Sequence, residues 1–319
     1  MTSLVDIPRR LRSGRAAEAP FLADATDGML SVARDLFENP QTVTLPDGRT
    51  LGYAETGDPD GDPVVAFHGI PSGRLGAAVF DHVGRAQGVR ILAPERPGVG
   101  ASDPDPDPDR EITDWSTDAA DFLDALDIDA VPVLGISGGG PYALACGALA
   151  PQRFPRVAVC CSIGPFESTD LQTRLLPLTA SYAPWVFGVF LRAEVLSAQY
   201  APEWTLDRRV KGTAPADEAV WRSEVGKVLV ASIPAACQHG TATFVREIQL
   251  FGRDWGFSLA DIDVPVGVWH GRADRLNPVE MGLSLWRAIP TAEGHFYPDL
   301  GHLGVIVETD DAMFEWLNR

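Results

Sequence analysis

Short apolar runs that alternate with amphipathic stretches restrict the fold of this chain more than any other feature. Four of these runs have the length of buried strands: residues 64–67, 90–93, 131–136 and 156–163. Three stretches between them space their apolar side chains as helices do: residues 76–87, 112–126 and 139–150. Strands that alternate with helices pair in parallel and carry helices on both faces of the sheet. The sequence therefore predicts an α/β fold built on a mostly parallel sheet.

The alternation stops between residues 164 and 257, where the sequence is rich in Leu, Ala, Trp and Pro. This region predicts several helices, at residues 171–178, 185–200, 216–231 and 241–250. Two strands and two helices then follow, at residues 264–269, 278–288, 294–297 and 305–317. A helical insertion in a parallel-sheet domain is a natural lid over a site at the carboxyl ends of the strands. We therefore expect an α/β core of residues 41–163 and 258–319, with residues 164–257 as a helical cap.

Residues 1–40 precede this pattern as an N-terminal arm. A short helix is expected at residues 29–37, and two strands at residues 41–45 and 50–55 follow it. The arm carries paired arginines, as some export signals do, but the next residues contain acids and no continuous apolar run. No segment reaches the ~18 uninterrupted apolar residues of a membrane span. We therefore expect a cytoplasmic protein without a membrane span.

The net charge and the cysteine spacing argue against several classes of binding partner and metal site. The formal net charge is −18, so the chain should repel nucleic acid and anionic membrane surfaces. The four cysteines match no zinc or redox spacing, and buried free thiols in a reducing cytoplasm explain them most simply. The alternating Asp-Pro stretch at residues 103–109 predicts a solvated loop and no metal site, because nothing near it closes a coordination shell. We expect a small-molecule substrate and no nucleic-acid partner.

A G-x-S-x-G pattern at residues 135–139 is the strongest local signal of function. It follows the apolar run at residues 131–134 and precedes a helical stretch, which is the setting of a nucleophile elbow. A serine on such a sharp turn has a strained backbone, and its neighbours must be small for the turn to close. The pattern predicts Ser137 as a nucleophile that projects above the sheet.

A serine nucleophile needs a base that takes its proton. Where such an elbow carries a triad, the chain order is serine, acid, histidine. His302 follows Gly301 on a loop just before the last predicted helix, late enough in the chain to satisfy that order. We therefore expect His302 to be the base.

The acid must orient the histidine and stabilise its cation. Asp274 follows the predicted strand at residues 264–269, so it lies at the carboxyl end of that strand, on the same rim as the elbow. Asp261 and Asp263 precede that strand and fall at the opposite edge. Asp299 lies so near His302 in sequence that its geometry would be awkward. Asp274 is therefore the expected acid of the triad.

An oxyanion hole is the third element that this chemistry needs. His68, Gly69 and Ile70 follow the predicted strand at residues 64–67 and can bring a backbone N–H to the site. We expect the N–H groups of Ile70 and Gly138 to stabilise the developing oxyanion. His68 itself is expected to hold the loop or border the pocket rather than act as a base.

With these residues in place, the chain resembles the α/β-hydrolase superfamily, in particular its lidded members with an H-G-x-P oxyanion loop. Three further stretches match family motifs: residues 95–102 with R-x-G-x-G-x-S, residues 270–274 with H-G-x-x-D, and Gly301-His302 with the terminal G-H. The resemblance covers residues 41–319 and is least specific over residues 164–257. It implies a central eight-stranded sheet whose second strand is antiparallel, and neither a metal nor an organic cofactor. Serine at the elbow, where dehalogenases and epoxide hydrolases of this fold have aspartate, argues against both of those activities.

The fold hosts many reactions, so the sequence leaves the chemistry open. The first hypothesis is a serine hydrolase that acts on a carboxylic ester or a related apolar acyl compound through an acyl-enzyme. The second is a biosynthetic enzyme of the same fold, such as a cyclase, lyase or dehydratase of secondary metabolism. The third is a non-catalytic small-molecule binder, against which the complete triad argues.

Aromatic residues of the expected cap suggest an apolar substrate pocket. The cap contributes Phe190 and four aromatics that are candidates for the wall of the pocket: Trp185, Phe187, Trp204 and Trp221. Each could equally lie in the core of the cap. The arm and the exposed cap could each mediate a homodimer, and the sequence does not decide between them.

Overall fold

Eight strands form one sheet in the order β1-β2-β4-β3-β5-β6-β7-β8. The computed structural model describes residues 19–319, so the arginine-rich part of the arm lies outside the described residues. The strands are β1 (Gln41–Thr44), β2 (Thr50–Gly57), β3 (Asp62–Phe67), β4 (Val89–Pro94), β5 (Val133–Ile136), β6 (Val157–Cys160), β7 (Val266–Gly271) and β8 (Ala292–Tyr297). Strand β2 pairs antiparallel with β1 and β4, and all pairs from β4 to β8 are parallel. The expected mostly parallel, eight-stranded sheet with an antiparallel second strand is confirmed.

The central strands are apolar along their whole length because both faces of the sheet are covered. In β3, Val64 and Ala66 belong to one buried cluster, whereas Val65 and Phe67 belong to another. Successive side chains of a strand point to opposite faces, so the two clusters are the two sides of the sheet. This is why the central strands read as continuous apolar runs rather than as alternating ones.

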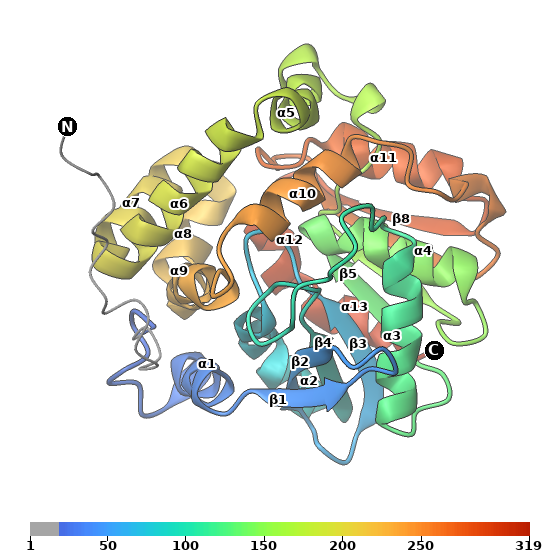
Figure 1. Ribbon diagram of the computed structural model, residues 1–319, viewed down its shortest axis with the longest axis horizontal. Helices are drawn as coiled ribbons and strands as arrows, with labels where there is room; N and C mark the ends of the chain where they lie inside the picture. The colour runs from blue at the N-terminus through green and yellow to red at the C-terminus, as the bar shows by residue number, and fades with distance from the viewer. Residues whose placement is uncertain (1–18) are drawn as a thin grey trace.

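Helices cover both faces of this sheet, as the alternating pattern predicts (Figure 1). One face packs against α3 (Asp114–Ala125), α4 (Gly140–Leu149) and α11 (Val279–Ala288). The other face packs against α1 (Gly28–Glu38), η2 (Arg74–Phe80), α2 (Asp81–Gln87), α12 (His302–Glu308) and α13 (Asp310–Leu317). The single helix expected at residues 305–317 is wrong, because Thr309 departs from helical backbone angles and separates α12 from α13.

A run of helices separates β6 from β7, and we refer to this segment, residues 161–265, as the insertion. Its main helices are α5 (Leu171–Tyr182), α6 (Pro184–Tyr200), α7 (Pro202–Gly212), α8 (Glu218–Arg222), α9 (Glu224–Ala236) and α10 (Ala242–Phe251). The expected helix at residues 216–231 is divided, because the hydroxyl of Ser223 caps α9 by accepting from the Val225 N–H. Helix α7 was not predicted. None of the helices within residues 19–319 combines the length and the hydropathy needed to cross a bilayer.

The insertion has an outer and an inner row (Figure 1). The outer row, drawn in yellow-green, consists of α5, α6 and α7. Helices α9 and α10 lie beneath it, since α6 contacts α9 and α5 contacts α10. Helix α9 also contacts η2 and α1, so it lies close to the sheet.

Candidate active site

Ser137 occupies the sharp turn between β5 and α4. Its backbone φ is +53°, in the left-handed region that a residue with a side chain rarely adopts. Small neighbours make the turn possible: a Cβ on Gly139 would overlap the carbonyl oxygen of Phe67, and one on Gly140 would overlap the hydroxyl of Ser162. The strand–turn–helix setting that the G-x-S-x-G pattern predicts is present, and such strain is typical of functional sites.

Asp274 and His302 meet although 28 residues separate them in the chain. His302 is the first residue of α12, and Asp274 follows β7. The distance between Nδ1 of His302 and Oδ2 of Asp274 is 2.7 Å, and both side chains are buried. The other carboxylate oxygen accepts from the backbone N–H groups of Leu276 and Asn277 at 2.8 and 2.9 Å. A carboxylate on Nδ1 fixes the tautomer and leaves Nε2 of the neutral imidazole as a base.

The charges around His302 favour its protonated form. Burial alone would lower the pKa of His302, but the charge of Asp274, its hydrogen bond and the charge of Asp217 together raise that pKa above its usual value. Burial alone would raise the pKa of Asp274, but the charge and hydrogen bond of His302 hold it below its usual value. Asp274 therefore stays ionised and can stabilise an imidazolium that forms during proton transfer.

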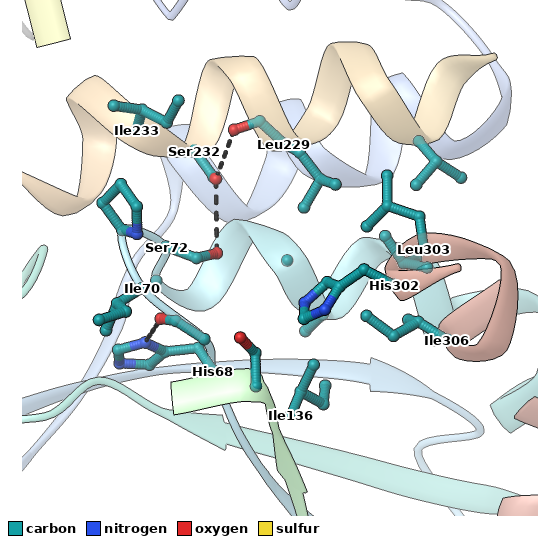
Figure 2. Close-up of a pocket in the computed structure, with 18 of the residues that line it drawn as sticks. His68, Ile70, Ser72, Ile136, Leu229, Ser232, Ile233, His302, Leu303 and Ile306 are labelled. Atoms are coloured by element: carbon teal, nitrogen blue, oxygen red, sulfur yellow. Dashed lines mark hydrogen bonds between the residues drawn. The ribbon is translucent and has the colours of Figure 1, made fainter. Parts of the chain in front are cut away.

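Ser137 and His302 line one cavity of about 130 Å³ at the carboxyl ends of the strands. Figure 2 shows its two sides: Leu229, Ser232 and Ile233 of α9 lie opposite the loop that follows β3. The imidazole of His302 points into the space between them (Figure 2). The wall is mostly aliphatic, so the cavity suits an apolar group next to the serine and the imidazole.

The loop after β3 runs directly against the nucleophile. A Cβ built on Gly69 would stand 3.2 Å from Cβ of Ser137, and one on Gly138 would stand 3.1 Å from the side chain of Ile70. The structure therefore brings together the two residues expected to supply oxyanion N–H groups. A side chain larger than hydrogen at either glycine would fill the space beside the serine.

His68 lies at the wall of the cavity with both ring nitrogens engaged. Its Nδ1 donates to the carbonyl of Gly69 at 2.9 Å, and its Nε2 accepts from the backbone N–H of Arg96 at 3.3 Å. Burial and the nearby charge of Arg96 hold the pKa of His68 well below its usual value. A neutral imidazole with both nitrogens occupied holds the loop and has no free nitrogen with which to act as a base.

Of the four aromatics expected at the pocket, the structure places only Trp221 in the wall of the described cavity. Trp185 and Trp204 are 72% and 58% exposed, and Phe187 packs in a separate small cluster with Leu191. These three residues are not part of the lining of that cavity. The inward face of α6 is taken by Leu191, Glu194 and Ala198, so Trp185 is directed to the outside.

Asn277 is a residue of the site that the sequence analysis missed. Its side-chain nitrogen donates to the hydroxyl of Ser137 at 3.4 Å and to the carbonyl of Cys161 at 2.7 Å. Its backbone carbonyl accepts from Nε2 of His270 at 2.8 Å. One asparagine thus joins the elbow, the end of β6 and the acid loop. The only signal in the sequence was its position three residues after Asp274.

A metal ion is a second use that this cluster of side chains could have. Within residues 19–319, the potential ligand atoms of Cys161, Asp274 and His302 lie within 4.8 Å of one another. A metal would have to break the hydrogen bond between Asp274 and His302 and deprotonate Cys161, whose pKa is raised well above its usual value by burial. The arrangement therefore fits proton transfer better than metal binding.

Comparison with known proteins was consistent with this geometry. The family model for the alpha/beta hydrolase fold matches residues 62–309. A 2-hydroxy-6-oxononadienedioate/2-hydroxy-6-oxononatrienedioate hydrolase of Cupriavidus pinatubonensis is 26% identical over 268 residues, which are 82% of this chain and 88% of the relative. A 2-hydroxymuconate semialdehyde hydrolase of Pseudomonas putida is 27% identical over 255 residues, 76% of this chain and 81% of the relative. An esterase from Exiguobacterium antarcticum shares the fold, with a TM-score of 0.64, 17% identity, and coverage of 88% of this chain and 99% of the esterase.

Proposed function

This chain belongs to the alpha/beta hydrolase fold family and is a hydrolase of that fold, and we propose that it cleaves a carboxylic ester or a related acyl compound with Ser137 as nucleophile. The observation that carries the proposal is the buried hydrogen bond between Asp274 and His302 at the cavity that Ser137 lines. A fixed tautomer, a strained serine and a shared cavity together support nucleophilic acyl transfer.

In the proposed reaction, Nε2 of His302 takes the proton of Ser137 while the serine oxygen attacks the carbonyl carbon. The resulting oxyanion accepts hydrogen bonds from the N–H groups of Ile70 and Gly138. His302 then donates its proton to the leaving alcohol, and water hydrolyses the acyl-enzyme by the same steps. In the structure the serine hydroxyl accepts from the side-chain nitrogen of Asn277. The hydrogen bond that this hydroxyl donates to Nε2 of the histidine base commonly tightens only with substrate.

The substrate that fits best has a neutral, apolar acyl group. Arg209 is the one arginine or lysine among the described residues that line the cavity, and it is already bonded to Glu194 at 2.6 and 3.0 Å. The relative from Cupriavidus pinatubonensis is named for a dioate. A second carboxylate would find no unpaired cation in this cavity, so burying it would be costly. An uncharged ester is therefore favoured over a dicarboxylate.

Turnover of a short p-nitrophenyl ester tests the proposal. We expect the wild type to hydrolyse p-nitrophenyl butyrate and Ser137→Ala to lose at least about 10⁴-fold in kcat. Ser284→Ala, a serine on α11 that donates to the carbonyl of Met281, is the matched control and should keep full activity. A fluorophosphonate probe should add its mass to Ser137 alone.

Two outcomes would contradict this function. If Ser137→Ala keeps its activity, the serine is not the nucleophile. If the wild type is inert to esters and to the probe yet binds a polycyclic ligand tightly, the fold serves non-hydrolytic chemistry or ligand binding instead.

We also propose a cytoplasmic location, no nucleic-acid partner and a homodimer. All four cysteines are free and buried, which suits a reducing compartment, and the net charge of −18 opposes binding to phosphates.

The homodimer is proposed through the outer row of the insertion. Five aromatic residues there are exposed: Tyr182, Trp185, Phe190, Tyr200 and Trp204. At their exposed fractions they present roughly 700 Å², near the ~800 Å² that each partner contributes to a stable interface.

A further inference from the structure

A buried aspartate from the insertion reaches the loop of His302. Asp217 ends a single 3₁₀ turn, η5 (Pro215–Asp217), between α7 and α8, yet it is only 1% exposed. Its Oδ1 accepts from the backbone N–H of Gly304 at 2.9 Å, and its Oδ2 accepts from the hydroxyl of Thr213 at 3.1 Å. Both carboxylate oxygens are therefore used, and one of them bonds the helix that begins with His302.

The contact between Asp217 and Gly304 supplies a hydrogen-bond acceptor at the start of α12, where no neighbouring side chain provides one. Helix α12 begins after Gly301, which has no side chain that could cap its free N–H groups. The carboxylate of Asp217 takes the place of a local cap, although it lies 87 residues away in the chain. A Cβ on Gly301 would overlap that carboxylate, so the glycine before the histidine is the residue that lets Asp217 approach.

The same segment of the insertion also binds the acid loop. Arg275, the residue after Asp274, donates from Nη1 to the carbonyl of Thr213 at 3.1 Å. Residues 213–217 are thus bonded to the loop of the acid and to the loop of the base. A shift of this segment would disturb both halves of the Asp274–His302 pair.

The negative charge of Asp217 also affects the pKa of His302. The titratable groups around His302 are Asp274 and His270 from the acid loop and strand β7, Cys161 after β6, and Asp217 from the insertion. Burial lowers the pKa of His302, and Asp217 acts with Asp274 to raise it. Neutralising Asp217 should therefore lower the pKa of His302.

We propose that Asp217 is a positioning residue through which the insertion holds the catalytic base in place. The insertion then does more than border the cavity: it completes the active site by fixing the start of α12. This inference rests on the proposed function for its kinetic test, but not for its spectroscopic one.

Two substitutions separate the hydrogen bond from the charge. Asp217→Asn keeps an oxygen that can accept from Gly304, so kcat at high pH should stay near the wild-type value while the midpoint of kcat/KM moves to lower pH. Asp217→Ala removes the acceptor, so kcat should fall at least about tenfold at every pH with a smaller change in KM. Asp310→Ala is the matched control, because Asp310 is a buried aspartate that bonds the first turn of α13 instead.

The control should lower the melting temperature and leave kcat and the pH midpoint unchanged. If Asp217→Ala behaves like Asp310→Ala, Asp217 is merely structural and the proposal is wrong. If the wild type hydrolyses no ester, the proposed function fails separately, and NMR titration of His302 still decides the role of Asp217. An unchanged His302 midpoint in Asp217→Asn would then overturn it, whereas a lower midpoint would support it.

Discussion

At the scale of single residues, the proposed mechanism makes the pair of Asp274 and His302 set the pH range in which the enzyme works. The imidazole acts as a base only when it is neutral. Because its pKa is raised above 6.5, a larger share of the molecules carries the inactive imidazolium near neutral pH. Activity is therefore gained as the pH rises through the raised pKa and lost as the pH falls below it.

This predicts a pH profile of kcat/KM whose acid limb has a midpoint above 6.5. Asp274→Asn should move the midpoint to lower pH and reduce kcat by about 10³–10⁴-fold, because the amide neither fixes the tautomer nor stabilises the cation. The measurement is ester hydrolysis in buffers of constant ionic strength. An acid limb unaffected by Asp274→Asn would show that another group titrates.

Gly140 is a second residue whose effect can be predicted from its surroundings. A methyl group there would overlap the hydroxyl of Ser162, so Gly140→Ala should destabilise the fold by about 1–3 kcal/mol through overpacking at the elbow. Gly188 offers the matched control in α6, because nothing lies within 4 Å of a Cβ there. Gly188→Ala should stabilise the fold by about 0.5–1 kcal/mol. Urea denaturation measures both, and an equal response would contradict the steric explanation.

Those candidate site residues that lie in a local sequence motif could be predicted from the sequence. Ser137, Asp274 and His302 each sit in a short pattern whose chain order is informative, and the structure pairs Asp274 with His302. Asn277 and Asp217 have no such pattern. Their roles arise from contacts across 140 and 87 residues, which no local spacing encodes.

At the scale of elements, a buried ion pair attaches helix α10 to the core. Arg96, in the loop after β4, bonds Glu247 of α10, and both side chains are buried. The same guanidinium donates to the carbonyl of His68 at 2.8 Å and lies over the ring of Tyr142. The pair therefore joins the insertion, the loop after β3 and α4.

Glu247→Ala should destabilise the protein by about 3–5 kcal/mol, because it leaves the Arg96 cation buried without a partner. Glu218→Ala is the control: its pair with Arg222 within α8 is exposed, and its loss should cost less than about 0.5 kcal/mol. Thermal and chemical denaturation report both values. If the two variants lose similar free energies of unfolding, the burial of Arg96 does not explain the contribution of its ion pair to stability.

The limits of the predicted elements follow from what periodicity can detect. The strands were found because runs such as 64–67 are continuously apolar, and β3 indeed occupies Asp62–Phe67. Breaks between consecutive helices were not found, because Ser223 and Thr309 interrupt the backbone without interrupting the apolar spacing. Helix α7 was missed because its sequence is strongly polar, with only Thr205, Leu206 and Val210 buried.

At the scale of the whole molecule, the outer row of the insertion is the surface on which exposed apolar side chains are concentrated. Helices α5, α6 and α7 are consecutive and in contact, and they carry twelve of the fifteen large apolar side chains that are exposed within residues 19–319. Extensive exposed apolar surface marks interaction sites. An apolar area of this size is stabilised when a second copy covers it.

We therefore predict a dimer in light scattering coupled to size exclusion. The double variant Trp185→Ser and Phe190→Ser should be monomeric, because it removes two of the five exposed aromatics. Trp286→Ser is the control, since Trp286 is 42% exposed but lies on α11, outside the insertion. A wild type that remains monomeric at about 50 µM would exclude a stable dimer through this surface.

The contact of Asp217 with Gly304 also limits how the protein can be re-engineered. Strands β6 and β7 are neighbours, so the helices between them can be regarded as an exchangeable module with closely spaced ends. A module transplanted from a relative would bring new pocket walls, and unless it also carried a carboxylate in the place of Asp217, the Gly304 N–H at the start of α12 would lose its acceptor. In such a chimera His302 would be held less firmly. The design would therefore have to include a hydrogen-bond acceptor for the Gly304 N–H together with the new pocket walls.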